Sequence, residues 1–217
     1  MKKFSYFLTL VSVLLIFLSS GISVNAAEIL PYWYSDTSEI RSFNSSSYSI
    51  SVIPRESITG MPEETIAAYS IHALNAWTNA LGSSSLSWTV DHVNPDMVIT
   101  DITRAEADSG NIPDNVLALG TMTGTKNLYY QAYYDGNLKL FYHYPNSIVY
   151  LIWDDTSSAY VDKAWQEITT HEVGHAIGHY GHNPDSTQLM YYSVNPSDGS
   201  YNTTPQSKDT SHMHLVY

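Results

Sequence analysis

Four of the nine histidines in this 217-residue chain, together with its last glutamate, lie in the twelve residues from His171 to His182. Two residues four positions apart in an α-helix share a face and lie roughly 6 Å apart along the axis, so His171 and His175 can direct imidazole nitrogens at one metal ion. Glu172 can then reach a water molecule on that ion without binding the ion itself. Zinc lowers the pKa of bound water from about 15.7 toward roughly 7, and a carboxylate can take its proton. The pattern therefore predicts a catalytic zinc site with Glu172 as the general base.

A catalytic zinc ion needs a third protein ligand, and the helix limits which residue can supply it. In an unbroken helix His182 would lie roughly 16 Å along the axis from His171, too far to share an ion. Gly178 and Gly181 can adopt the positive φ values that end a helix and turn the chain back. We therefore expect the helix to end at Gly178 and His182 to become the third ligand, with His179 as the alternative.

This stretch resembles the metzincin metallopeptidases, and among them the bacterial matrixin-like enzymes, whose pattern is His-Glu-x-x-His-x-x-Gly-x-x-His followed by a methionine turn. Met190 lies eight residues after His182, as in matrixins, within the segment Ser186–Tyr191. One spacing differs, because three residues separate Gly178 from His182 where the family has two. The resemblance implies a zinc-dependent endopeptidase in which Met190 lies beneath the metal ligands.

Two further residues are alternative ligands. Astacin-like and serralysin-like relatives place a zinc-binding tyrosine two residues after the turn methionine, which is the position of Tyr192, although matrixins lack it. Thermolysin-like enzymes take their third ligand from a glutamate downstream, but no glutamate follows Glu172 here. The nearest aspartate, Asp185, lacks the spacing of that class.

The N-terminus predicts export. Lys2 and Lys3 precede an apolar run over residues 7–18, and residues 24–26 (Val-Asn-Ala) fit the small-x-small cleavage rule, so residues 1–26 are predicted to be a secretory signal peptide. The run is short for a membrane anchor, and no second segment of spanning length follows. We expect a secreted protein that has no membrane association after signal removal.

Composition narrows the context further. The chain has no cysteine, which suits secretion of the Gram-positive type and excludes both a lipid-modified cysteine and the cysteine latch of animal matrixins. The formal net charge of −12 becomes −14 without the two lysines of the signal peptide, and this argues against nucleic acid as a partner. We expect a protein or peptide substrate and a monomer.

The mature chain is predicted to consist of an extended arm or short pro-segment over residues 27–47 and one catalytic domain over residues 48–217. In some bacterial relatives an N-terminal aspartate on the zinc keeps the enzyme latent, and Asp36 is the candidate here. Hydrophobic patterning predicts strands and helices in the domain. The strands are expected at 48–53, 86–90, 97–102, 116–122 and 147–153, and the helices at 62–81, from 159 through the histidines, and at 205–216.

The family resemblance implies an α+β fold with a twisted mixed sheet, an antiparallel edge strand, a backing helix, an active-site helix and a C-terminal helix. In that layout residues 117–120 would pair with an extended substrate. Matrixins also carry an acidic calcium-binding stretch after the equivalent of strand 147–153. Asp154 and Asp155 are therefore candidate Ca²⁺ ligands, although a solvated approach to the next helix explains them equally well.

A β-hairpin is predicted over residues 128–144, because Asp135-Gly136 separates two aromatic-rich runs. Seven tyrosines lie between Tyr129 and Tyr150. They either supply strand propensity and packing or form a surface for peptide or glycan near the cleft. The second interpretation supports a rival function, a catalytically weak secreted binding protein on the same scaffold.

Overall fold

The computed structural model describes residues 39–43, 45–134, 137–154, 161–193, 200–214 and 217. Its strands are β1 (Glu39–Phe43), β2 (Ser47–Ile53), β3 (Ser87–Val90), β4 (Met97–Thr103), β5 (Ala118–Thr123), β6 (Asn127–Tyr134), β7 (Asn137–Tyr144) and β8 (Asn146–Trp153). Its helices are α2 (Glu56–Thr59), α3 (Glu63–Leu81), α4 (Arg104–Ser109), α5 (Asp162–Ala176) and α6 (Ser207–Met213).

The central sheet has five strands in the order β3-β2-β4-β8-β5. The first four are parallel to one another, and β5 pairs with β8 in the antiparallel direction, with Gly120 opposite Val149. This arrangement confirms the predicted α+β class and the mixed sheet with an antiparallel edge strand. Strands β4 and β8 lie inside the sheet, and most of their residues are buried or partly buried.

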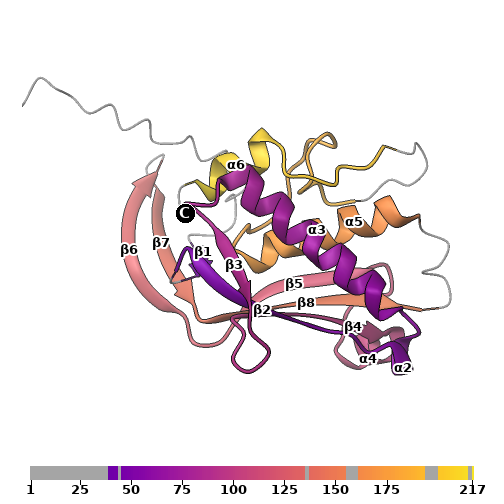
Figure 1. The fold of residues 1–217 in the computed structure, drawn as a ribbon. Helices are drawn as coiled ribbons and strands as arrows, with labels where there is room; N and C mark the ends of the chain where they lie inside the picture. The colour runs from indigo at the N-terminus through magenta and orange to yellow at the C-terminus, as the bar shows by residue number, and fades with distance from the viewer. Residues whose placement is uncertain (1–38, 44, 135–136, 155–160, 194–199, 215–216) are drawn as a thin grey trace, which may run out of the picture.

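Helices α3 and α5 cover one face of this sheet, and α6 lies beyond them (Figure 1). Helix α3 begins directly after Pro62, one residue later than predicted, and ends before Gly82, as predicted. Its residues Ile66, Leu74 and Trp77 are fully buried against the sheet and α5. Because both helices bury one side, the position and orientation of α5 are fixed by the core.

A second sheet, with the order β1-β7-β6, stands at one end of the first (Figure 1). The predicted hairpin is present, since β6 and β7 pair in the antiparallel direction as far as Tyr134 and Asn137, while the turn between them lies outside the described residues. Strand β1 was not predicted. It lies in the segment assigned to an arm, pairs with β7 in the parallel direction, and buries Ile40 and Phe43.

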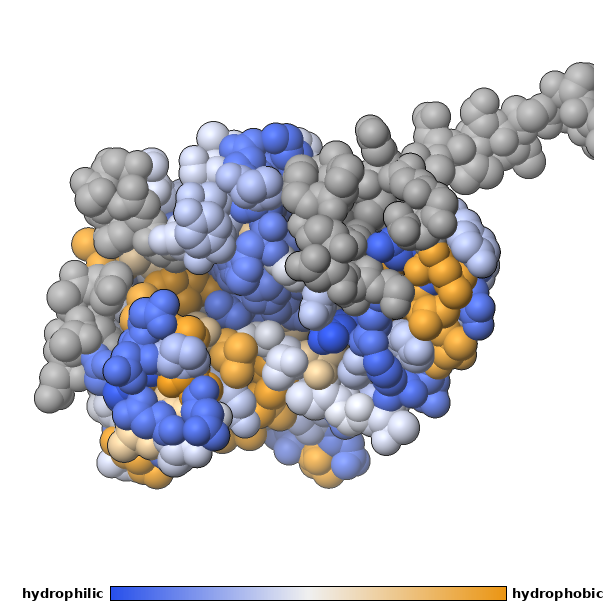
Figure 2. Space-filling view, turned by 180° about the vertical axis from the view of Figure 1, so that it is seen from behind, coloured by the Kyte–Doolittle hydropathy of each residue, from blue (hydrophilic) through white to orange (hydrophobic). Residues whose placement is uncertain are grey.

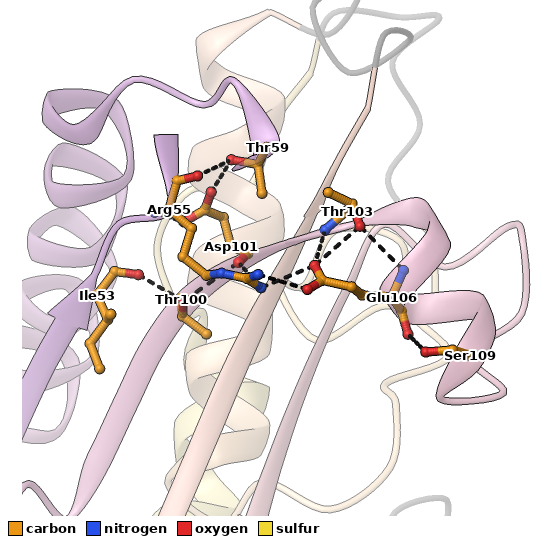
Figure 3. A network of polar contacts seen from close by, with 8 residues as sticks. All are labelled: Ile53, Arg55, Thr59, Thr100, Asp101, Thr103, Glu106 and Ser109. Atoms are coloured by element: carbon orange, nitrogen blue, oxygen red, sulfur yellow. Dashed lines mark hydrogen bonds and ion pairs between the residues drawn. The ribbon is translucent and has the colours of Figure 1, made fainter. Parts of the chain in front are cut away.

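Polar contacts join the two short helices α2 and α4, which the sequence did not predict, to the end of β4 (Figure 3). The buried Asp101 carboxylate accepts hydrogen bonds from the backbone N–H of Arg55, at 2.8 Å, and from the Thr59 hydroxyl. The Arg55 guanidinium donates to both carboxylate oxygens of Glu106, at 3.0 and 2.6 Å. Glu106 also completes a capping box with Thr103, which begins α4.

Some expectations concern residues that the structure does not describe, namely the signal peptide 1–26, Asp36, the turn 135–136 and Asp155. Helix α6 covers Ser207–Met213 and is shorter than the predicted 205–216. Within the described part of the chain, no helix combines the length and apolar character needed to cross a membrane.

Candidate metal centre

Helix α5 carries His171 and His175 one turn apart. The indole Nε1 of Trp77, from α3, donates a hydrogen bond of 2.8 Å to the carbonyl oxygen of Thr170, the residue before the first histidine. Trp165 and Ile168 bury the same helix in the core, at exposed fractions of 1% and 4%. The two histidines therefore project from a support that is packed along its length.

The helix ends in a Schellman motif at the predicted glycine. Gly178 has φ = +118°, and the N–H groups of Gly178 and His179 donate to carbonyls of the last turn of α5, at 3.1 and 2.9 Å. Gly181, with φ = +82°, turns the chain a second time. These two turns return His182 to the histidines of the helix.

Three imidazole nitrogens converge at this point. The Nε2 atom of His175 lies 3.1 Å from Nε2 of His171 and 3.3 Å from Nε2 of His182. The ligand atoms of the three side chains all lie within 4.8 Å of one another. In the residues that the structure describes, this is the one cluster of three or more histidine or acidic side chains with the geometry to hold a metal ion, and it could bind one.

The hydrogen bonds of two of these rings determine their tautomers. Nδ1 of His171 lies 2.9 Å from the carbonyl oxygen of Leu189, and Nδ1 of His175 lies 2.7 Å from that of His179. Because a carbonyl can only accept, each Nδ1 carries the proton and each Nε2 keeps a lone pair. Burial, aided by the neighbouring histidines, lowers the pKa of His171 well below its usual range and that of His175 to about 4. Both rings are neutral at pH 7, as metal ligands must be.

The alternative ligand, His179, does not join the cluster. Its ring is only 1% exposed and packs beside the Trp77 indole, with the ring centroids 6.3 Å apart. Its backbone carbonyl, as described above, fixes the tautomer of His175. The structure thus brings His182, rather than His179, to the two helical histidines.

The side chain of Glu172, a residue of α5, contacts the edge strand β5. Its Oε2 accepts a hydrogen bond of 2.6 Å from the backbone N–H of Gly120. A Cβ atom on Gly120 would lie 1.9 Å from the carbonyl oxygen of Glu172, so only glycine permits the strand to lie this close to the helix. Burial raises the pKa of Glu172 to about 7, against the opposing effect of the Gly120 hydrogen bond. Sequence analysis placed Gly120 on the predicted edge strand but did not identify its contact with Glu172.

The predicted methionine turn packs against the histidine helix. Met190 is fully buried, and a Cβ atom on Gly174 would lie only 2.7 Å from its sulfur. Asp209, from α6, accepts hydrogen bonds from the backbone N–H groups of Leu189 and Met190, at 2.9 and 3.2 Å. The Leu189 carbonyl in turn accepts from His171, so Asp209 supports a metal-site histidine through the turn. Sequence analysis missed Asp209, because a single acid in a polar terminal helix has no distinguishing spacing.

The other two alternative ligands have other contacts. Tyr192 is 67% exposed, and its ring lies on that of Tyr191 with centroids 4.3 Å apart. The Asp185 carboxylate accepts hydrogen bonds from Thr187 and from Lys208. Among the described residues, Asp185 is not part of the cluster of three histidines, and the ring contact of Tyr192 is with Tyr191.

A pocket of about 230 Å³ adjoins His175 and His182, two of the three converging histidines. Strand β5 and the loop after α5 form most of its wall, and β1 contributes one residue, Arg41. The lining residues are Arg41, Leu119, Gly120, Thr121, Met122, His175, Gly178, His179, Tyr180, Gly181 and His182. The face turned away from the viewer in Figure 1 is hollowed near its middle, and mainly hydrophilic residues lie in the hollow (Figure 2).

No protein-family model matches this chain, and no curated protein matches it significantly. Any assignment of function therefore depends on the residues and the geometry described above.

Proposed function

We propose that the protein is a secreted zinc-dependent endopeptidase of the matrixin-like metzincin type. The convergence of three histidine Nε2 atoms beside a buried glutamate carries this proposal. Tetrahedral zinc with Zn–N distances of about 2.0–2.1 Å places neighbouring nitrogens about 3.3 Å apart. The separations of 3.1 and 3.3 Å at His175 agree with that value. Three histidines with one open position form the ligand set of a catalytic rather than a structural zinc site.

The site's own residues supply the acid–base chemistry. Zinc, when bound, acidifies a water molecule and polarises the carbonyl group of the substrate. Glu172 accepts the proton of the attacking water and later delivers it to the leaving amine. The N–H of Gly120 holds the Glu172 carboxylate at the edge of β5, and this contact positions the base before substrate arrives.

The edge strand supports a polypeptide substrate. In the described residues β5 pairs with β8 on one side, and its other side has no partner strand. An extended peptide can pair with the free N–H and C=O groups of such an edge, whatever its sequence. The substrate would therefore be an unfolded or flexible segment of a protein.

The predicted signal peptide over residues 1–26 supports export, so we propose that the protein acts outside the cell, in a bacterium that secretes in the Gram-positive manner. The strong negative charge suits an extracellular protein that needs to stay soluble and does not bind nucleic acid. Zinc is the proposed cofactor, and we propose a monomer.

Glu172→Ala tests the proposal. The variant should retain one zinc ion per chain, because all three histidines remain, and should lose peptide hydrolysis by about 10²- to 10⁴-fold in kcat/KM. Glu64→Ala, which removes an exposed glutamate from α3, is the matched control and should keep full activity. Hydrolysis by Glu172→Ala at the wild-type rate would refute the mechanism.

A second candidate, a catalytically weak binding protein, has one observation in its favour. Tyr130 and Tyr133 of the hairpin are 53% and 75% exposed, more than packing alone requires. Glu172 argues against this candidate, because a metal site used only for structure has no need of a carboxylate beside its first ligand. Binding of a polymer by a protein that hydrolyses no peptide would favour it.

A further inference from the structure

We propose that Arg41 selects substrates with an acidic residue close to the cleaved bond, on its N-terminal side. This inference rests on the proposed endopeptidase function and adds a substrate class to it. It concerns the pocket next to His175 and His182, to which β1 contributes Arg41. Strand β1 belongs to the second sheet and lies outside the elements expected from the family resemblance.

The Arg41 guanidinium is held in place at the edge of the pocket. Its Nε lies 2.9 Å from Oε1 of Glu39. Its carbon Cζ lies over two aromatic rings, 4.3 Å from the centroid of Tyr180 and 5.6 Å from that of Tyr144. Tyr180 lines the same pocket, so this stacking keeps the cation beside the cavity.

Backbone packing fixes β1 relative to the metal centre. A Cβ atom on Gly178 would lie 2.2 Å from the carbonyl oxygen of Arg41, so β1 directly contacts the turn that ends α5. The Tyr217 hydroxyl joins the two segments, because it accepts from the N–H of Phe43 at 3.1 Å and donates to the carbonyl of Ile177 at 2.7 Å. Arg41 therefore has a defined position relative to the histidines.

The charge around Arg41 favours an anion. The Glu39 carboxylate accepts hydrogen bonds from Lys126 and from the Tyr144 hydroxyl, in addition to its contact with Arg41, so two cations share one carboxylate. A guanidinium has five N–H donors, and within the described residues the only ion pair of Arg41 is the one between its Nε and Glu39. Arg41 is also the one permanently charged side chain in the pocket lining. Its outer N–H groups are suited to a bidentate contact with a carboxylate.

The place of the pocket along β5 determines which substrate residue it would receive. Gly120 is level with the catalytic glutamate through its hydrogen bond. Of the other β5 residues that line the pocket, Leu119 precedes that point and Thr121 and Met122 follow it, so most of this wall lies on the Met122 side. A peptide that pairs antiparallel to β5 places its N-terminal residues opposite Thr121 and Met122. The side chain that reaches Arg41 is therefore one that precedes the cleaved bond.

The experiment compares peptides that differ only by aspartate, asparagine or lysine at each of the three positions before the cleaved bond. Zinc-loaded wild-type protein should cleave the aspartate peptide with a kcat/KM about 10- to 100-fold higher at one of these positions. Arg41→Gln should abolish that preference, and Arg41→Glu should replace it with a preference for lysine. Lys126→Gln is the matched control, because Lys126 contacts the same Glu39 carboxylate but does not line the pocket, and it should weaken the preference by much less than Arg41→Gln does.

Equal cleavage of the two peptides by the wild type, or an equal loss of preference in Lys126→Gln and Arg41→Gln, would overturn the role of Arg41. Neither result affects the proposed hydrolysis, which Glu172→Ala tests separately. Binding of the same peptides to zinc-loaded Glu172→Ala, measured by calorimetry, gives a readout that does not depend on turnover. There the aspartate peptide should bind more tightly, and Arg41→Gln added to that variant should remove the difference.

Discussion

Asp209 offers a test of how the methionine turn supports the metal site from outside it. Its carboxylate accepts hydrogen bonds from the backbone N–H groups of Leu189, Met190 and Gln206, at 2.9, 3.2 and 2.8 Å. Asp209 is fully buried, and so are Leu189 and Met190. Asp209→Ala would leave at least two buried donors without an acceptor.

The expected effect follows from those donors. Each buried donor without a partner costs about 1–3 kcal/mol, and removal of the buried carboxylate offsets part of this, so we expect a net loss of about 2–4 kcal/mol in the free energy of unfolding. For a chain of this size that loss lowers Tm by about 5–15 °C. The Leu189 carbonyl that accepts from His171 would also become less well ordered, so zinc affinity should fall about 10- to 100-fold.

Thermal denaturation followed by circular dichroism gives the stability of Asp209→Ala, and competition with a chromophoric chelator gives its zinc affinity. Asp209→Asn is the matched variant. One amide oxygen can still accept from two of the three N–H groups, so this variant should lose about half as much stability. A Tm within 2 °C of the wild type together with unchanged zinc affinity in Asp209→Ala would refute the reasoning.

Three further predictions concern the turn after α5, the general base and the hairpin. Gly178→Ala should lower the free energy of unfolding by about 3–5 kcal/mol, because it combines a positive φ with a clash against a backbone oxygen. The control Gly60→Ala, at a position with φ = +80° and open space around it, should lower it by only about 1–2 kcal/mol. Equal losses of the two variants in chemical denaturation would contradict the predicted clash. Burial raises the pKa of Glu172 to about 7 in the absence of metal, and a bound cation lowers that pKa. Because the base must be deprotonated, kcat/KM should fall as the pH is lowered, with a midpoint below pH 7. A midpoint above pH 7 would count against Glu172 as the base. If the hairpin contacts substrate, replacing the exposed Tyr130 and Tyr133 with serine should raise KM and leave Tm nearly unchanged. An unchanged KM would show that these tyrosines have no role in substrate binding.

The elements that could be predicted from sequence are those with a local pattern. The strand over 48–53 and the helix over 62–81 appear as β2 and α3, because period-2 and period-3.6 alternation arise within each segment. Strand β1 could not be predicted in this way. Its partner β7 lies about a hundred residues further along the chain, with Glu39 opposite Leu140, and no feature of either segment specifies a parallel pairing with the other.

In the candidate site, too, the residues within one short segment could be predicted from the sequence, whereas the contacts between distant segments could not. His171, His175 and His182 lie within twelve residues, and helix geometry together with two glycines was sufficient to bring them together. The contacts that orient these groups come from distant segments. Gly120 lies 52 residues before Glu172, and Asp209 lies 20 residues after Leu189, so their roles depend on how β5 and α6 pack against α5 and its turn.

The metal content of the purified protein tests the central claim most directly. Elemental analysis of the wild type after exposure to zinc and removal of excess ion should give one zinc per chain, and X-ray absorption at the zinc edge should give three histidine nitrogens as protein ligands. His182→Ala should lose the metal, while His179→Ala should keep it, because the His179 ring lies beside Trp77 and is not one of the three converging imidazoles. Wild-type protein without bound zinc, or loss of zinc in His179→Ala with retention in His182→Ala, would contradict the account.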